Sequence, residues 1–170
     1  MNVSDAIRTK RAVRKFQARP LSQDDVASIL NAGRRAQSSK NEQTWHFIAV
    51  RDREILAALS VCGDWAGHLA GAALGVAILT PDPSARFQIM FDAGQAAAYM
   101  QLAAWERGIG SCLASIYDTE KARLILGFPP ELHLRIMLSF GFPAEAQLLT
   151  AAPRKGGRRR LDEIVHTDRW

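Results

Sequence analysis

The sequence has little of several features that mark particular classes of protein. Its 170 residues include only two cysteines, Cys62 and Cys112. That is too few for a disulfide scaffold and indicates a reducing, cytoplasmic location. Its most apolar stretch, residues 69–79, is far shorter than the roughly 20 residues that cross a bilayer, and residues 1–8 lack the apolar core of a signal peptide. We therefore expect one domain spanning 1–170 with no membrane partner.

Common catalytic motifs are also missing. The segment 108–113 (GIGSCL) begins like a dinucleotide fingerprint, but Leu113 occupies the third glycine position and the glycines follow a predicted helix rather than a strand. None of the four histidines has a ligand partner at metal-binding spacing, and no serine lies in a G-x-S-x-G elbow. We expect no metal site and no catalytic triad, so in an enzyme of this kind a bound cofactor would carry the chemistry.

Positive charge is concentrated at the two ends of the chain. Eleven of the 22 basic residues lie there: Arg8, Lys10, Arg11, Arg14, Lys15, Arg19, Arg154, Lys155, Arg158, Arg159 and Arg160. The pattern suits solvated tails, a nucleic-acid-binding module, or one small anion held by both ends. Val13 and Phe16 alternate with basic residues as in a half-buried extended segment. Because zinc-finger, basic-zipper and aromatic-platform patterns are missing, we favour the small anion and expect no nucleic acid.

Hydrophobic periodicity predicts alternating helices and strands. The helices are expected over residues 5–11 (capped by Ser4), from Ser22 with Asp25 as a capping box, and over 54–61, 87–107 and 118–126; the strands over 45–50, 73–80, 110–115 and 134–140. The longest helix is apolar on nearly every side, which is typical of a central helix or a subunit contact. The arrangement predicts a sheet covered by helices on both faces.

Four stretches, in order along the chain, carry a resemblance to one family. Residues 10–16 (KRAVRKF) are similar to R-R-S-x-R-x-F, and residues 36–45 (AQSSKNEQTW) to A-P-S-x-x-N-x-Q-P-W. The Ala-rich helix over 92–106, followed by GIGSC, resembles A-x-x-x-G-L-G-S-C, and residues 158–166 (RRRLDEIVH) resemble a closing basic motif. Together these motifs cover nearly the whole chain, which resembles the FMN-dependent nitroreductases in their short form.

The resemblance implies a fold, an assembly and an activity. The fold would be α+β, a three-layer α/β/α sandwich with a central mixed, mainly antiparallel sheet. The protein would be a homodimer with FMN at the subunit interface. NADH or NADPH would reduce the flavin at N5, and a nitroaromatic, quinone or related small-molecule acceptor would then be reduced in a ping-pong sequence. No catalytic side chain is implied. A specialised relative, of dehydrogenase, desaturase or dehalogenase type, is the alternative.

The resemblance also implies cofactor-binding residues. Lys10, Arg11, Ala12, Arg158 and Arg159 match positions at the FMN phosphate and ribityl chain, with the choice among Arg158, Arg159 and Arg160 left open. Arg14 matches a residue at the pyrimidine edge, where it would tune the flavin. Ser38, Ser39 and Asn41 match a loop that approaches from the partner subunit, and Leu113, Ala114 and Ser115 match a strand end beside the ring. Ala12 replaces the family's serine, while Gln37 and Thr44 replace prolines.

Overall fold

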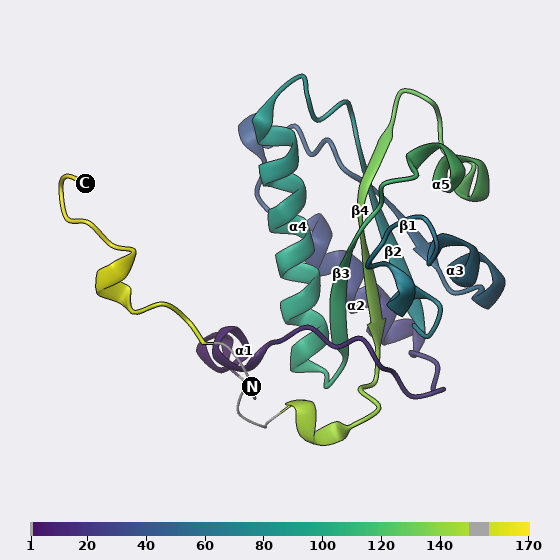
Figure 1. Cartoon of the computed structure of the whole chain (residues 1–170), viewed down its shortest axis with the longest axis horizontal. Helices are drawn as coiled ribbons and strands as arrows, with labels where there is room; N and C mark the ends of the chain where they lie inside the picture. Colours follow the sequence, from purple (N-terminus) through teal and green to yellow (C-terminus); the bar gives the residue numbers. More distant parts are fainter. Residues whose placement is uncertain (1, 150–156) are drawn as a thin grey trace.

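The computed structural model describes residues 2–149 and 157–170, and it shows one sheet between two layers of helices (Figure 1). The strands are β1 (His46–Val50), β2 (Leu74–Thr80), β3 (Gly110–Ser115) and β4 (His133–Gly141), and the helices are α1 (Val3–Thr9), α2 (Gln23–Arg34), α3 (Arg53–Leu59), α4 (Phe87–Glu106) and α5 (Thr119–Leu126). The sheet order is β1-β2-β4-β3, with every neighbouring pair antiparallel. One parallel bridge, Ala12 to Ser111, adds the mixed character. The predicted three-layer α+β fold is confirmed.

Local signals place most helix ends where the sequence indicated. Ser22 and Asp25 form the expected capping box at the start of α2. Gly127 closes α5 in the left-handed conformation, with φ 68°. The first helix differs from its prediction, because Asn2 rather than Ser4 caps it and it ends at Thr9. The Asn2 side chain accepts a hydrogen bond from the Asp5 N–H, so the helix starts two residues earlier than expected.

Helices α2 and α4 cover one face of the sheet. Ile29 of α2, Met100 of α4 and Phe140 of β4 are fully buried in this layer. Gly33 lets the two helices approach closely, because a Cβ there would lie 2.1 Å from the Met100 side chain. These contacts make α4 the central helix of the fold.

The other face is covered by α3, α5 and the short 3₁₀ turn η2 (Gly67–Leu69). Leu56, Leu69 and Met137 pack there against the sheet, and Gly75 leaves room for the Leu56 side chain. In the part of the chain described, no helix is both long and apolar enough to cross a membrane.

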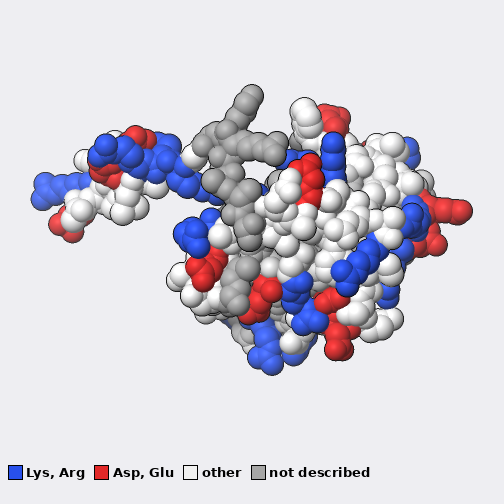
Figure 2. Space-filling model, turned by 90° about the horizontal axis from the view of Figure 1, so that it is seen from below, with Lys and Arg blue, Asp and Glu red and all other residues white. Residues whose placement is uncertain are grey.

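The N-terminal helix α1 and the start of the C-terminal arm lie near one another. The C-terminal arm, residues 157–170, begins beside α1 and then extends away from the body with one short 3₁₀ turn, Leu161–Glu163 (Figure 1). Figure 2 shows Lys and Arg side chains along this arm with acidic side chains among them, and basic and acidic side chains are also mixed on the visible face of the body. Arg154 and Lys155 lie outside the described residues.

Candidate functional site

The basic segment after α1 docks on the edge strand β3. The N–H of Val13 donates to the carbonyl of Ser111 over 2.9 Å, beside the parallel Ala12–Ser111 bridge. Further on, Phe16 bridges Pro143 in the antiparallel sense. Val13 is 1% exposed, whereas the flanking Ala12 and Arg14 point outward. The expected half-buried extended segment is therefore present, with Arg14 displayed on its outer side.

Two glycines of the sheet allow this segment to lie so close. A Cβ on Gly110 would come within 2.6 Å of the Val13 Cβ, and one on Gly141 within 2.8 Å of the Phe16 ring. Both contacts involve side chains that anchor the segment. The position of Arg14 therefore depends on the presence of glycine at both 110 and 141.

We expect Gly110→Ala to loosen the segment and to lower the free energy of unfolding by about 1–3 kcal/mol, as overpacking generally does. Gly67→Ala is the matched control, because a Cβ there has no atom within 4 Å. Urea unfolding of both variants measures the difference. Equal stabilities for the two variants would show that the close approach at Gly110 carries no strain.

The two basic ends of the chain meet near the C-terminal half of α4. The Lys10 ammonium donates to the Gln101 side chain over 3.0 Å. Burial lowers the pKa of Lys10, and the nearby positive charge of Arg158 lowers it further. Among the described residues, no carboxylate forms an ion pair with either cation. Lys10 and Arg158 thus form a cluster of uncompensated positive charge, here called the cation cluster.

The three consecutive arginines of the arm are not equivalent. Arg159 donates to the Glu163 carbonyl over 2.8 Å, and Arg160 forms an ion pair with Asp162. Arg158 has no such acidic neighbour in the described part of the chain, and its charge acts on Lys10. The geometry therefore favours Arg158 as the member of the triplet available to an anion. Arg11 is half-buried, and within the described ranges its side chain donates to the Thr9 carbonyl, over 3.3 Å, and to no other group.

Arg14 lies over a series of buried, hydrogen-bonded polar groups near the start of β3. His68 Nδ1 is 2.7 Å from Ser139 Oγ, and Ser139 Oγ donates to the Cys112 carbonyl over 3.3 Å. His68 Nε2 is buried without a hydrogen-bond partner among the described residues. Burial lowers the pKa of His68, and the Arg14 charge lowers it further. Burial raises the pKa of the Cys112 thiol, and the positive charges of Arg14 and Lys10 partly offset this increase.

These hydrogen-bonded groups could not be predicted from the sequence. His68, Ser139 and Cys112 are separated by 71 and 27 residues, so no local motif links them. Only the pairing of β3 with β4, and the docking of η2 against the sheet, bring them together.

We expect His68 to make the protein less stable in mild acid. In the unfolded chain its pKa is near 6.5, and the buried native imidazole takes up its proton only at lower pH. Between these two pKa values the unfolded state binds more protons, so the free energy of unfolding falls as the pH is lowered through that range. Urea unfolding at pH 8 and pH 5 should show a smaller loss for His68→Gln than for the parent. An equal loss of stability in the parent and in His68→Gln would contradict the role of His68 in the acid sensitivity.

The loop that carries Ser38, Ser39 and Asn41 is fixed to the other end of α4. The Ser39 N–H donates to the buried Asp92 carboxylate over 2.8 Å, and the Gln43 N–H donates to Ser38 Oγ over 3.0 Å. Lys40, Asn41 and Gln43 all have positive φ, between 50° and 57°. Several such residues in one short loop are uncommon and are concentrated at functional sites.

This loop and the cation cluster do not meet within one protomer. Their anchors on α4, Asp92 and Gln101, are nine residues apart, which corresponds to about 13 Å along the helix. Figure 1 shows the N-terminal segment and α1 near the lower end of α4, opposite the end from which α4 starts.

The predicted strand-end residues of β3 differ in what they offer. The Leu113 side chain is 45% exposed, while Ala114 is buried on the opposite face of the sheet. The carbonyl of Ser115 lies against Gly63, where a Cβ would approach it to 2.1 Å. Leu113 alone of the three presents substantial side-chain surface, because alternate strand residues point to opposite faces. Within the described ranges, no group of three or more possible ligand side chains is placed to hold a metal.

Comparisons with known proteins point to one family. The family model described as "Nitroreductase family" matches residues 7–62 and 64–142. An Archaeoglobus fulgidus protein, provisionally named NADH dehydrogenase/NAD(P)H nitroreductase, is 29% identical, with 96% of each chain covered.

Solved structures show the same fold. A Clostridium difficile FMN-dependent nitroreductase is 27% identical with a TM-score of 0.84, covering 99% of this chain and 100% of the other. NfrA1 of B. megaterium has a TM-score of 0.86 at 20% identity, covering 99% of this chain and 74% of its own. The family match covers most of the chain, including the basic segment that docks on β3 and the strands beside it. The chain belongs to the nitroreductase family.

Proposed function

We propose that this protein is a cytoplasmic FMN-dependent oxidoreductase that takes electrons from NADH or NADPH and reduces a small-molecule acceptor such as a nitroaromatic or a quinone. The observation that carries the proposal is that Arg158, near one end of a nitroreductase-family chain, lies close enough to Lys10, near the other end, for its charge to act on it, beside the extended segment that displays Arg14.

The residues suit a phosphorylated ligand with an extended shape. The cation cluster offers two positive charges without a carboxylate partner in the described part of the chain, and half-buried Arg11 lies next to Lys10. The pKa of Lys10 is lowered by burial and by the charge of Arg158, and an anion there would oppose both effects. Charge-assisted hydrogen bonds to phosphate are among the stronger polar contacts in proteins. We assign the phosphate to Lys10, Arg11 and Arg158, with the backbone of Ala12 beside them.

Arg14 would serve the other end of such a ligand. The charges of Lys10 and Arg14 both act on Cys112 of β3, and the charge of Arg14 also acts on His68. An exposed guanidinium beside a low-dielectric layer stabilises negative charge that develops on a neighbouring ring. When bound, FMN would supply the hydride chemistry, while Arg14 and the backbone of β3 near Leu113 and Ser115 would orient its ring.

We further propose a homodimer in which each protomer completes the site of the other. Helix α4 exposes three aromatic side chains, here called the α4 stripe: Phe87 is 78% and Phe91 67% exposed in its first turns, and Tyr99, 41% exposed, follows about two turns later. Exposed aromatic residues at helical spacing are typical of a protein contact. The 38–43 loop, too far from its own cation cluster, would then contribute Ser38, Ser39 and Asn41 to the partner's flavin.

The test is the absorbance of the purified protein, followed by anaerobic titration with NADH and with NADPH. We expect a flavin spectrum that persists through gel filtration and is bleached by at least one donor. A colourless protein that does not take up added FMN would refute the proposal. Bound FMN that neither donor reduces would instead indicate a specialised relative of the dehydrogenase, desaturase or dehalogenase type.

A further inference from the structure

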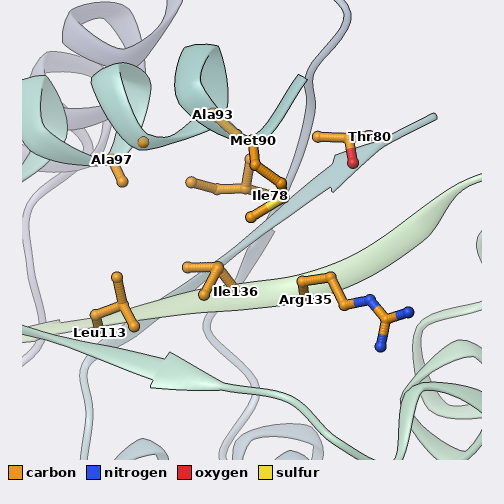
Figure 3. A pocket seen from close by; sticks show the side chains of 9 residues that line it. Ile78, Thr80, Met90, Ala93, Ala97, Leu113, Arg135 and Ile136 are labelled. Carbon is orange, nitrogen blue, oxygen red and sulfur yellow. The ribbon is translucent and has the colours of Figure 1, made fainter. Parts of the chain in front are cut away.

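Two hollows of the molecule have opposite chemistry. One lies between α4 and the sheet, where side chains such as Ile78 and Ile136 make it mainly apolar (Figure 3). The other, of about 290 Å³, lies where β1 ends and β2 begins. It is lined by Arg19, Arg51 and Arg53 together with residues 71–73, and it is here called the arginine pocket.

The three arginines come from separate parts of the chain. Arg19 lies between α1 and α2, Arg51 directly follows β1, and Arg53 is the first residue of α3. Because β1 pairs with β2 in the antiparallel sense, residues 71–73 before β2 lie beside the end of β1. The pocket therefore forms only in the folded chain, and no sequence motif marks it.

Two of the three guanidinium groups are held in place by the protein. The Arg19 guanidinium carbon lies 3.9 Å from the centre of the Phe142 ring, and Phe142 packs against the core. The Arg51 side chain donates to the Leu21 carbonyl over 2.9 Å, and its guanidinium has further N–H donors. Side chains that are already fixed lose less conformational freedom when a ligand binds. The pocket is thus partly pre-organised.

The positive charge of the arginine pocket has no partner of opposite sign in the described part of the chain. Arg19, Arg51 and Arg53 form no ion pair there. Asp52, the carboxylate nearest in sequence, accepts hydrogen bonds from two backbone N–H groups of α3 instead. Like charges around one hollow repel one another, and an anion between them would oppose that repulsion. The pocket therefore has the charge and the donors of an anion site.

The arrangement of the cations favours phosphate over carboxylate. Guanidinium groups match both anions in pairs of parallel hydrogen bonds. A tetrahedral phosphate presents oxygens in several directions, so cations from three chain segments can reach it, whereas a carboxylate presents both oxygens in one plane. The volume is close to the lower limit of the roughly 300–1,000 Å³ that is typical of small-molecule sites. A compound with one or two phosphate groups suits this space, and a dinucleotide is too large for it.

We propose that the arginine pocket binds a small phosphorylated anion, as a second anion site besides the cation cluster. The two sites lie toward opposite edges of the sheet, since Lys10 precedes the segment that docks on β3, whereas Arg51 follows β1. These two edge strands are three strand spacings apart, or about 14 Å. The site does not rest on the flavin proposal, because no lining residue belongs to the cation cluster.

The test is calorimetric titration of inorganic pyrophosphate into the protein with excess FMN, in a phosphate-free buffer at constant ionic strength. We expect one pyrophosphate per chain. Arg19→Met keeps an apolar stem over the Phe142 ring but removes the charge, and it should weaken binding about tenfold or more. Arg34→Met is the matched control, because Arg34 is an exposed arginine of α2 that does not line the pocket. This control should bind pyrophosphate like the parent.

A second variant leaves all three arginines in place. Gly71→Asp adds a negative charge to the lining at a position where a Cβ meets no atom within 4 Å. It should also weaken pyrophosphate binding about tenfold or more, because the carboxylate repels the anion. Gly67→Asp is its control, since a Cβ there is equally free and the residue does not line the pocket. The Tm of each variant shows that it is folded, and Arg19→Met decides if Gly71→Asp is not.

The outcomes separate this site from the flavin site. Lys10→Met, Arg158→Ala removes the cation cluster and should bind pyrophosphate like the parent, whether or not the protein takes up FMN. Loss of binding in that double variant, with normal binding in Arg19→Met, would place pyrophosphate at the cation cluster and overturn the proposal. Absence of binding in the parent would overturn it as well. Citrate, a carboxylate anion of similar charge, should bind more weakly, and equal or tighter citrate binding would refute the preference for phosphate.

Discussion

The double variant Lys10→Met, Arg158→Ala should bind FMN at least about a hundredfold more weakly than the parent. These two residues form the cation cluster, and neither is paired with a carboxylate in the described part of the chain. Hydrogen bonds that involve a charged group contribute roughly 1.5–3 kcal/mol each, so losing two removes about 3–6 kcal/mol. A tenfold change in Kd corresponds to about 1.4 kcal/mol. Quenching of flavin fluorescence on titration into the flavin-free protein gives the Kd.

The same variant should fold normally. The lowered pKa of Lys10 means that the protonated side chain is less favourable in the folded state than in the unfolded chain at neutral pH. Methionine keeps the apolar stem without the charge, so the Tm of the flavin-free protein should not fall. Arg160→Ala is the control, because Arg160 is equally part of the arm but is paired with Asp162. Equal FMN affinity in the double variant and in Arg160→Ala would refute the assignment of Lys10 and Arg158 to the FMN phosphate.

Phe91→Asp should convert the proposed dimer to a monomer that retains little flavin. Phe91 is 67% exposed on the α4 stripe, so in one protomer its replacement disturbs no core contact. A carboxylate in the centre of an apolar interface would be buried without a partner, which is strongly unfavourable. Light scattering coupled to gel filtration measures the mass, and absorbance of the same peak measures the flavin. Loss of both together is expected, because each site would need the partner's 38–43 loop.

Leu124→Asp is the matched control for this experiment. Leu124 lies on α5 and is 75% exposed, but α5 covers the opposite face of the sheet from α4. Its replacement introduces the same charge at a similarly exposed apolar position. If both variants stay dimeric, the α4 stripe is not the interface. If Phe91→Asp becomes monomeric yet keeps its flavin, the loop does not complete the partner's site.

Much of the architecture could be predicted because its signals are local. The Ser22–Asp25 capping box and Gly127 depend on contacts within a few residues, and the sheet strands follow short apolar runs between turn residues. The prediction that Ser4 caps α1 was wrong. Asn2 and Ser4 are both good caps, and the competition between them depends on where Ala6 packs against Trp105.

The amino-acid sequence alone was enough to predict the order of helices and strands, the family resemblance, and the basic residues at both ends of the chain. It could not choose among Arg158, Arg159 and Arg160, or indicate that His68 lies under Arg14. The folded chain shows which of these arginines have acidic partners, places His68 near Arg14, forms the cavity beside α4 and separates the 38–43 loop from Lys10. The physical reason is that helices and strands form from contacts between near neighbours, whereas these features depend on how α4, β3 and the chain ends pack over long sequence separations.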